Sequence, residues 1–246
     1  MQFEEISQLV KGIPFMESER AKILYDFIIE NRVTECLELG FAHGVGSCYI
    51  AAALDELGTG QLTSVDLLEA KQWQEPSIEA LLARTGLENY VTVAREHSSY
   101  TWFLKKKIEE CTEDGYCSPV YDFCFIDGPK NWTIDGFAFF LVDKLLKQGG
   151  WLLFDDLGWK YSRYCSSDTF DGLDLQRMGE DELDTAHIDL VFRLLVMQHP
   201  DYSNFKIQDS WWAWAQKVAA PTKKVRYEVT HNLLNKLAAR RGKDRE

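Results

Sequence analysis

The sequence of 246 residues lacks any uncharged apolar run close to the roughly 20 residues that a membrane-spanning helix requires. Its first residues, MQFEEISQLVKG, show neither the basic start nor the apolar stretch of a signal peptide. Proline is scarce, with 6 residues, while 46% of the chain is hydrophobic and 13% aromatic, which excludes a disordered or collagen-like protein. These observations predict a soluble, cytoplasmic protein without membrane contact, and the length favours a single mixed domain.

Basic residues are outnumbered, because 27 lysines and arginines face 39 acidic residues, for a net charge of -12. Such a charge repels nucleic-acid phosphates, so it argues against general nucleic-acid binding and favours a small or neutral substrate. The segment 222–246 differs, since eight basic and three acidic residues give it a local charge of +5. We interpret it as a solvated C-terminal helix and tail.

Cysteine is also sparse, with 6 residues and no pair in a C-x-x-C spacing. A zinc-binding knuckle is therefore not indicated. Cys36, Cys48 and Cys124 lie among apolar residues of predicted strands and helices. We expect the thiols to be reduced packing residues.

An alternation of apolar strands and helices fills residues 34–157. The predicted strands are Thr34–Leu39, Gln61–Asp66, Val91–Ala94, Tyr121–Asp127 and Gly150–Asp155. The predicted helices are Ser47–Leu57, Ile78–Thr85, Tyr100–Glu110 and Ile134–Leu146, preceded by Ile6–Ile13 and Glu17–Asn31. Strands that alternate with helices of this length predict βαβ crossovers and a parallel sheet covered on both faces.

The pattern changes after residue 157. The stretch Leu157–Thr185, with many aromatic and acidic residues, predicts a variable loop or lid, and Ala186–Met197 predicts a helix. Asn204–Gln208 and Ser210–Val218 predict an antiparallel hairpin. The fold class is therefore α/β, a Rossmann-like doubly wound sheet, mostly parallel, with helices on both faces. The single domain divides into N-terminal helices (1–33), a core (34–157), a loop (158–185), a closing helix and strands (186–220) and a basic tail (221–246).

A glycine-rich loop, ELGFAHGVGS at Glu38–Ser47, follows the first predicted strand. Glycines here let a ligand approach the backbone closely. The spacing E-x-G-x-x-x-G-x-G differs from the G-x-G-x-x-G of dinucleotide-binding folds. Asp66 ends the next strand, 26 residues after Gly40, where a carboxylate can accept hydrogen bonds from both hydroxyls of a ribose. The two features together predict an adenosine-containing ligand.

Three carboxylates follow the fourth and fifth predicted strands. Asp127 ends one strand, and Asp155 and Asp156 end the next. Because the carboxyl ends of parallel strands share one edge of a sheet, we expect these acids to converge near the glycine loop. Clustered acids repel one another unless protons or a cation intervene. Oxygen ligands favour Mg²⁺, or Mn²⁺ in its place, and the sequence leaves both open.

These motifs resemble those of the class I S-adenosylmethionine-dependent methyltransferases, over about Thr34 to Leu157, half of the chain. Within that class the sequence is most similar to the metal-dependent O-methyltransferases, such as the catechol, sugar and macrolide enzymes. The resemblance implies that S-adenosylmethionine is bound by Glu38, Gly40, Phe41, Ala42, Gly44, Gly46, Ser47, Asp66, Leu67, Ser98 and Asp127. It implies that the metal is held by Asp127, Asp155 and Asp156.

The resemblance also implies a catalytic base, Lys130, three residues after Asp127, where the catechol enzyme has a lysine and many sugar enzymes have a histidine. Near a divalent cation and away from bulk water, the pKa of Lys130 would fall toward neutrality, which would let it take a hydroxyl proton. In the implied reaction the metal acidifies an acceptor hydroxyl, and the oxygen attacks the sulfonium methyl group in line.

The acceptor is predicted as a hydroxylated small molecule. Gly128 and Pro129 stand where the catechol enzyme has bulkier residues, which argues against a catechol. The lid-like segment favours a larger acceptor, such as a sugar, a glycoside or another natural product, with or without a vicinal diol. The aromatic residues that either line the acceptor site or pack in the core and lid are Trp132, Trp159, Tyr161 and Tyr164. The two N-terminal helices either roof the site or form a contact in a homo-oligomer.

Three alternatives stay open. The first is a phenolic or catechol O-methyltransferase. The second is a nucleotide-dependent dehydrogenase on a similar sheet, against which the glycine spacing and the Asp155-Asp156 pair argue. The third is a non-catalytic protein that kept the cofactor pocket, which the intact set of three aspartates and Lys130 does not favour.

Overall fold

The computed structural model describes residues 1–218, and the tail predicted at residues 221–246 lies outside this range. At its centre is a seven-stranded sheet in the order β10-β11-β7-β6-β1-β2-β3. These strands are β1 (Glu35–Leu39), β2 (Gln61–Leu67), β3 (Val91–Glu96), β6 (Tyr121–Ile126), β7 (Leu146–Phe154), β10 (Tyr202–Gln208) and β11 (Trp212–Lys217). Neighbours from β3 to β7 are parallel, whereas β11 is antiparallel to both β7 and β10. The predicted fold class is confirmed.

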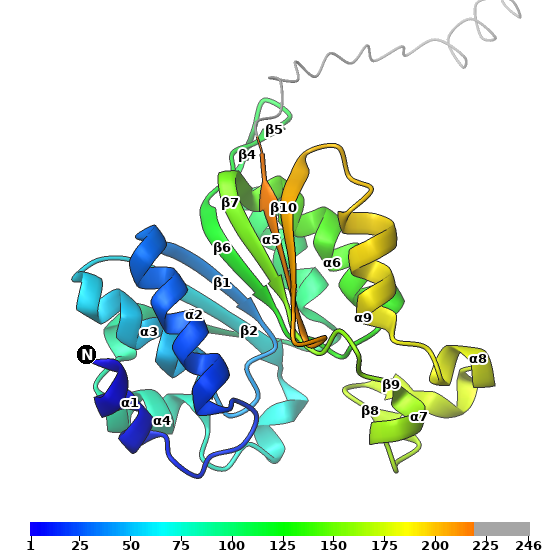
Figure 1. Cartoon of the computed structure of the whole chain (residues 1–246), viewed down its shortest axis with the longest axis horizontal. Helices are drawn as coiled ribbons and strands as arrows, with labels where there is room; N and C mark the ends of the chain where they lie inside the picture. The colour runs from blue at the N-terminus through cyan, green and yellow to red at the C-terminus, as the bar shows by residue number, and fades with distance from the viewer. Residues whose placement is uncertain (219–246) are drawn as a thin grey trace, which may run out of the picture.

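Helices cover both faces of the sheet (Figure 1). One face carries α1 (Phe3–Leu9), α2 (Ser18–Asn31), α3 (Val45–Leu57) and α4 (Ile78–Thr85). The other carries α5 (Tyr100–Glu110), α6 (Trp132–Leu145), α9 (His187–Leu190) and the π-helical η4 (Val191–Val196). Successive strand residues point to opposite faces, so β1 places Cys36 in the hydrophobic cluster of the first face and Leu37 in that of the second. Both faces are therefore buried, as a parallel sheet requires.

The strand β7 begins four residues before the predicted start at Gly150. Leu146, directly after α6, is fully buried and already pairs with Tyr121. The pairing register shifts between this pair and the next, and Gly149 has a φ of +84°. The two glycines thus form an irregularity within the strand rather than a turn before it.

The segment predicted as a lid, residues 157–185, folds into short elements beyond one end of the sheet (Figure 1). They are α7 (Tyr161–Tyr164), β8 (Thr169–Phe170), β9 (Leu173–Asp174), η3 (Leu175–Arg177) and α8 (Glu180–Leu183). Trp159, Tyr161 and Leu175 bury their side chains together there. A hairpin that the sequence analysis does not predict, β4 (Thr112–Glu113) with β5 (Tyr116–Cys117), lies at the opposite end.

The described residues also bear on the membrane and disulfide expectations. Within residues 1–218, no helix is both long and apolar enough to cross a membrane. All six cysteines lie in this range as thiols, and Cys36, Cys48 and Cys124 are buried, as predicted for packing residues.

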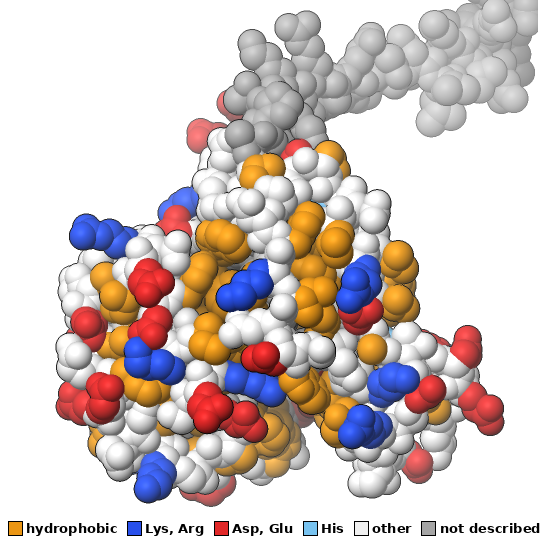
Figure 2. All heavy atoms as spheres, in the orientation of Figure 1, with side chains coloured by type: hydrophobic (Ala, Val, Ile, Leu, Met, Phe, Trp, Pro, Cys, Tyr) orange, Lys and Arg blue, Asp and Glu red, His pale blue; other side chains and the backbone are white. Residues whose placement is uncertain are grey.

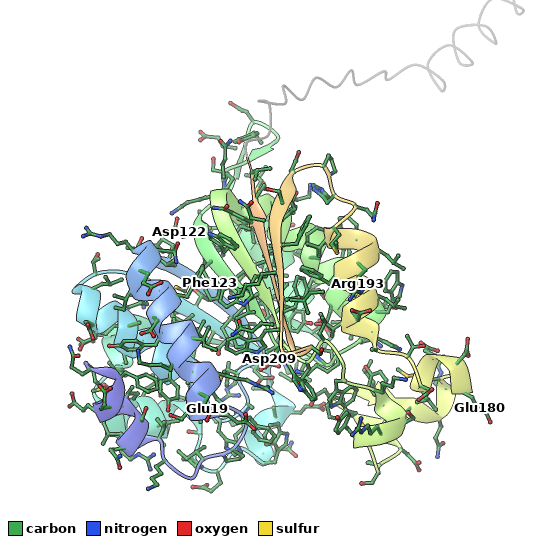
Figure 3. The ribbon with its side chains drawn as sticks, viewed as in Figure 1. Glu19, Asp122, Phe123, Glu180, Arg193 and Asp209 are labelled. Atoms are coloured by element: carbon green, nitrogen blue, oxygen red, sulfur yellow. The ribbon has the colours of Figure 1, made fainter. Side chains whose placement is uncertain are left out.

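The core around Phe123 provides a test of the fold. Phe123, at the start of β6 (Figure 3), is fully buried, and its ring centroid lies 5.5 Å from that of Phe27. We expect Phe123→Ala to lower the free energy of unfolding by about 3–5 kcal/mol, because it leaves a cavity. Phe137→Ala is the matched control, since that side chain is 55% exposed. Urea unfolding followed by circular dichroism measures both variants, and equal losses would contradict this assignment of the core.

Candidate functional site

A cavity of about 760 Å³ opens at the carboxyl end of the parallel strands. Besides the loops that follow β1, β2, β3, β6 and β7, it is lined by Ile13–Glu17, Arg20, Trp159, Phe170 and Asp171. Figure 2 shows the surface indented at the lower edge of the view, between the N-terminal helices and the part that contains α7. Because the connection before α2 lines the cavity, the structure favours a roof over the site as the role of the N-terminal segment.

The glycine loop leaves β1 in a conformation that only small residues fit. Gly40 has a φ of +89°, and a Cβ there would overlap the backbone carbonyl of Asp127. Gly44 has a φ of +88°, and its Cβ would come within 2.5 Å of Ile78. A Cβ at Gly46 would lie 2.7 Å from a carboxylate oxygen of Glu38. The glycines therefore bring the loop against β6 and α4 and keep side chains out of the space above β1.

Glu38 is a buried carboxyl group beneath this loop. Its Oε2 accepts hydrogen bonds from the hydroxyls of Ser47 and Ser64, the latter at 2.7 Å. Burial raises the pKa of Glu38 to about 7, although both hydroxyl hydrogen bonds act to lower it. Ser47 is fully buried behind Glu38 and lines neither the main cavity nor the small pocket beside it, so it supports Glu38 rather than facing a ligand.

Asp66 joins the glycine loop to the end of β2. Its Oδ2 accepts from the backbone amides of Phe41 at 3.2 Å and Ala42 at 2.9 Å, and its Oδ1 accepts from that of Leu67 at 2.7 Å. Burial raises the pKa of Asp66, and these amide hydrogen bonds partly oppose the shift. The side chain is thus held at the cavity wall, at the position predicted for ribose recognition.

The predicted cofactor residues divide by location. Those that line the main cavity are Gly40, Ala42, Asp66, Leu67, Ser98 and Asp127. A small pocket that shares some of these walls is lined in addition by Glu38, Phe41 and Gly46. Gly44 and Ser47 line neither space. Gly44 packs against Ile78, and Ser47 donates a hydrogen bond to Glu38.

The three predicted carboxylates converge at the cavity, as expected. Asp127 follows β6, and Asp155 and Asp156 follow β7. Lys130, which is 8% exposed, places its Nζ between two of them, hydrogen-bonded to Asp127 and 3.3 Å from Asp156 Oδ2. The Oδ1 of Asp155 accepts from the indole Nε1 of Trp212 at 2.9 Å and from the Asp156 amide at 2.6 Å.

Without a cation beside it, Lys130 has a raised pKa, and the lowering that the sequence analysis expects beside a divalent cation stays a prediction. Burial lowers the pKa of Lys130, but the charges of Asp127, Asp156 and Asp155 together raise it more, and the net result lies above its ordinary value. Burial raises the pKa of Asp127, against the opposing effect of Lys130, and raises that of Asp155 to about 6. The neighbouring carboxylates thus favour the ammonium form of Lys130.

The chemistry of the three carboxylates suits a hard divalent cation. Lys130 Nζ engages Asp127 and Asp156, while Trp212 engages Asp155, whose Oδ1 also lies 3.9 Å from Arg20 Nη1. Within the described part of the chain, no three acidic, histidine or cysteine side chains are grouped to hold a metal ion. Magnesium binding by Asp127, Asp155 and Asp156 stays a prediction.

Two of the groups around these acids come from distant parts of the sequence. Arg20 lies on α2, and its guanidinium stacks over the ring of Trp211 at 5.2 Å. Trp212 begins β11, directly after the turn that carries Asp209, which Figure 3 shows at this end of the sheet. No local sequence pattern marks Arg20 or Trp212. Their contacts with Asp155 form only because α2 and β11 fold next to the cavity.

The Gly128-Pro129 departure from the catechol enzymes has a local cause. The hydroxyl of buried Tyr100 hydrogen-bonds Asp135, and a Cβ at residue 128 would overlap that hydroxyl. Asp135 also accepts from the backbone amide of Asn131 at 2.6 Å, and Asn131 caps α6 through its Oδ1. This network fixes the loop from Asp127 to α6, and a buried aspartate inside an apolar helix is the signal that could have revealed it.

The four predicted aromatic residues take different places. Trp159 lines the cavity. Tyr161 is fully buried and donates to the carbonyl of Pro129 at 2.8 Å, so it packs the lid onto the loop. Trp132 and Tyr164 are 37% and 44% exposed and do not line the cavity.

The strand order and the cavity at the carboxyl ends of the strands belong to a Rossmann-like fold that solved methyltransferases share. Residues 37–157 match the family model of a methyltransferase domain. No match was found among curated proteins.

Solved structures share this fold at low sequence identity. A putative caffeoyl-CoA O-methyltransferase from Staphylococcus aureus has a TM-score of 0.59 and 20% identity, over 88% of this chain and 92% of that one. An O-methyltransferase from Bacillus cereus, solved with SAH, has a TM-score of 0.59 and 16% identity, over 87% and 90%. The O-methyltransferase TomG from Streptomyces achromogenes is involved in tomaymycin synthesis and was solved with SAM. It has a TM-score of 0.57 and 16% identity, over 88% of this chain and 89% of that one.

The buried Glu38 gives a test based on pH. Its pKa of about 7 in the folded chain exceeds the ordinary 4.5, so the folded state binds this proton more tightly and Glu38 costs stability as the pH rises between these values. We expect Glu38→Gln to match the wild type below pH 4.5 and to exceed its stability above pH 7, by up to about 3 kcal/mol. Thermal melts from pH 4 to 8 measure the difference, and two parallel curves would show that Glu38 is not perturbed.

Proposed function

We propose that this protein transfers a methyl group from S-adenosylmethionine to a hydroxyl group of a small molecule. The observation that carries the proposal is one cavity with two halves. The glycine loop and Asp66 form the first half, and Lys130 with its aspartates forms the second. A cofactor in the first half would meet an acceptor in the second, and such positioning lowers the barrier to a two-reactant step.

The first half has the features that an adenosine cofactor with an amino-acid tail requires. The space above β1 is kept open because Gly40 carries no side chain. Asp66 offers carboxylate oxygens at the wall for ribose hydroxyls, and Leu67 and Ser98 continue that wall. When bound, S-adenosylmethionine supplies a methyl group activated by a sulfonium. The TomG and Bacillus cereus structures, which share the fold, hold SAM and SAH, and this supports the assignment.

The second half provides the groups that a hydroxyl nucleophile requires. Methylation of a hydroxyl forms an O–C bond, breaks an S–C bond and releases the hydroxyl proton. The Lys130 ammonium stabilises negative charge on the acceptor oxygen. A carboxylate of Asp127 or Asp156, both beside Lys130, accepts the proton. In this proposal Lys130 acts as a positive charge, and the role of base that the resemblance implies for it stays a prediction.

The walls of the second half favour a hydroxylated acceptor with an extended apolar surface. Trp159 and Phe170 line the cavity from the lid, whereas Phe15 and Met16 lie against the glycine loop, and aromatic faces suit sugars as well as planar rings. A sugar, glycoside or similar natural product is our first choice, and a phenolic acceptor is the alternative. Asp127, Asp155 and Asp156 would hold Mg²⁺ at this wall, and the bound cation would lower the pKa of an acceptor hydroxyl.

Calorimetric titration with S-adenosylmethionine and S-adenosylhomocysteine tests the cofactor. We expect both to bind, and Asp66→Ala to weaken binding by about tenfold or more, because each charge-assisted hydrogen bond to the ribose contributes roughly 1.5–3 kcal/mol. Asp189→Ala, which removes an acid paired with Arg193 outside the cavity, should bind like the wild type. Binding of NAD in place of both ligands would refute the proposal.

An acceptor screen tests the reaction. The protein, S-adenosylmethionine and a panel of glycosides, polyols and phenols are incubated, and mass spectrometry detects addition of one methyl group. Methylation of a hydroxyl supports the proposal, and its position distinguishes the sugar from the phenolic alternative. Methylation confined to amines or thiols would refute an O-methyltransferase.

A further inference from the structure

Gln74 is a buried side chain that contacts Asp66 from behind the cavity wall. It lies shortly after η1 (Glu69–Gln72), is 4% exposed and does not line the cavity. Its Nε2 donates to Asp66 Oδ2 at 3.3 Å, and its Oε1 accepts from Arg95 Nη1 at 2.8 Å. Burying an amide is costly unless its polar groups find partners, and here both ends do. Gln74 therefore links the acid predicted to bind the ribose to a cation on β3.

The partners of Gln74 fix which way its amide points. A guanidinium only donates hydrogen bonds and an ionised carboxylate only accepts them, so Oε1 faces Arg95 and the NH2 group faces Asp66. Arg95 is the register partner of Asp66 across β3 and β2, and its Nη2 lies 3.3 Å from a carboxylate oxygen of Glu79 on α4. Its guanidinium also lies over the ring of Phe41, 4.9 Å from the centroid. Arg95 is therefore a fixed anchor for the Gln74 amide.

The hydrogen bonds to Asp66 are unequally divided between its two oxygens. Oδ2 accepts three, from the backbone amides of Phe41 and Ala42 and from the side chain of Gln74. Oδ1 accepts one, from the backbone amide of Leu67. A carboxylate oxygen has about two lone-pair sites, so Oδ2 is fully engaged and Oδ1 keeps a site for a ligand. Rotation about Cβ–Cγ would exchange the oxygens, and because such torsions have no sharp preference of their own, the contact with Gln74 helps to decide which oxygen stays open.

We propose that Gln74 is a positioning residue that holds the Asp66 carboxylate in the rotation that leaves Oδ1 for a ribose hydroxyl, and that it thereby sets the selectivity of the site for ribose over deoxyribose. The inference rests on the proposed S-adenosylmethionine site. Because Gln74 does not line the cavity, it acts only through Asp66. A ligand that lacks the hydroxyl gains nothing from the correct rotation of Asp66, so the contribution of Gln74 should vanish with that ligand.

Calorimetric titration of the full chain with S-adenosylhomocysteine and with its 2′-deoxy and 3′-deoxy analogues tests the inference. We expect the wild type to bind S-adenosylhomocysteine about tenfold more tightly, or better, than at least one deoxy analogue, because that analogue lacks a hydrogen bond to a charged group. Gln74→Met keeps the length of the side chain but removes the amide, so this affinity ratio should fall toward one. Gln74→Asn keeps an amide but is one methylene shorter and should lower the ratio as well, which provides a second variant if thermal melting shows that the first does not fold.

Gln198→Met is the matched control, because the same change removes an amide that donates to the carbonyl of Arg193 at 3.4 Å, outside the cavity. It should keep the wild-type ratio. A wild type that binds both deoxy analogues as tightly as S-adenosylhomocysteine would overturn the inference without any variant. Equal weakening of all three ligands in Gln74→Met would overturn it too, because Gln74 would then support the cavity wall in general rather than the ribose contact.

The same titration separates this inference from the proposed function. If the wild type binds S-adenosylhomocysteine but the ratio is unchanged in Gln74→Met, the methyltransferase proposal survives and the role of Gln74 fails. If the wild type does not bind S-adenosylhomocysteine, the proposed function fails and the inference fails with it.

Discussion

Repulsion among carboxylates at one sheet edge is the constraint on which the candidate site depends. A parallel sheet brings the ends of neighbouring strands together, so Asp127 after β6 and Asp155 and Asp156 after β7 share one cavity. Such a cluster needs positive charge or protons. Lys130 provides the charge, and the raised pKa values of Asp127 and Asp155 show that burial also favours protons there. The rest of the site serves to hold these groups in place.

The supports of this cluster come from outside the matched methyltransferase region, residues 37–157. Trp212 reaches Asp155 from the antiparallel strand β11, and Arg20 approaches from α2. The closing hairpin therefore does more than complete the sheet, because Trp212, the first residue of β11, holds an acid of the cavity. Tyr161 does the same for the Lys130 loop from the lid, through the carbonyl of Pro129.

The sequence alone predicts the features that repeat along the chain and those that mark the ends of strands. Apolar alternation locates the strands, and Asp66 and Asp127 are predictable because parallel topology assigns their ends to one edge. Contacts between residues that lie far apart in the sequence cannot be predicted in this way, so the hydrogen bond from Trp212 to Asp155 is not among the predictions. The direction of the Lys130 pKa shift depends on how close each carboxylate lies and on whether a cation is bound, and a sequence gives only the order of these residues along the chain. The early start of β7 was missed because glycines that read as a turn form an irregularity inside the strand.

The charge of the cavity discriminates among its possible ligands. The acids that line it are Glu17, Asp66, Asp127, Asp155, Asp156 and Asp171, and the bases are Arg20 and Lys130. A dinucleotide would bring a doubly charged pyrophosphate toward this surplus of acids, with Gly40 at a spacing that the dinucleotide motif does not have. A sulfonium cofactor carries a positive charge, and the same acids attract it. An uncharged hydroxylated acceptor adds no charge of its own, so the Lys130 ammonium remains available to the oxygen that becomes negative during the transfer.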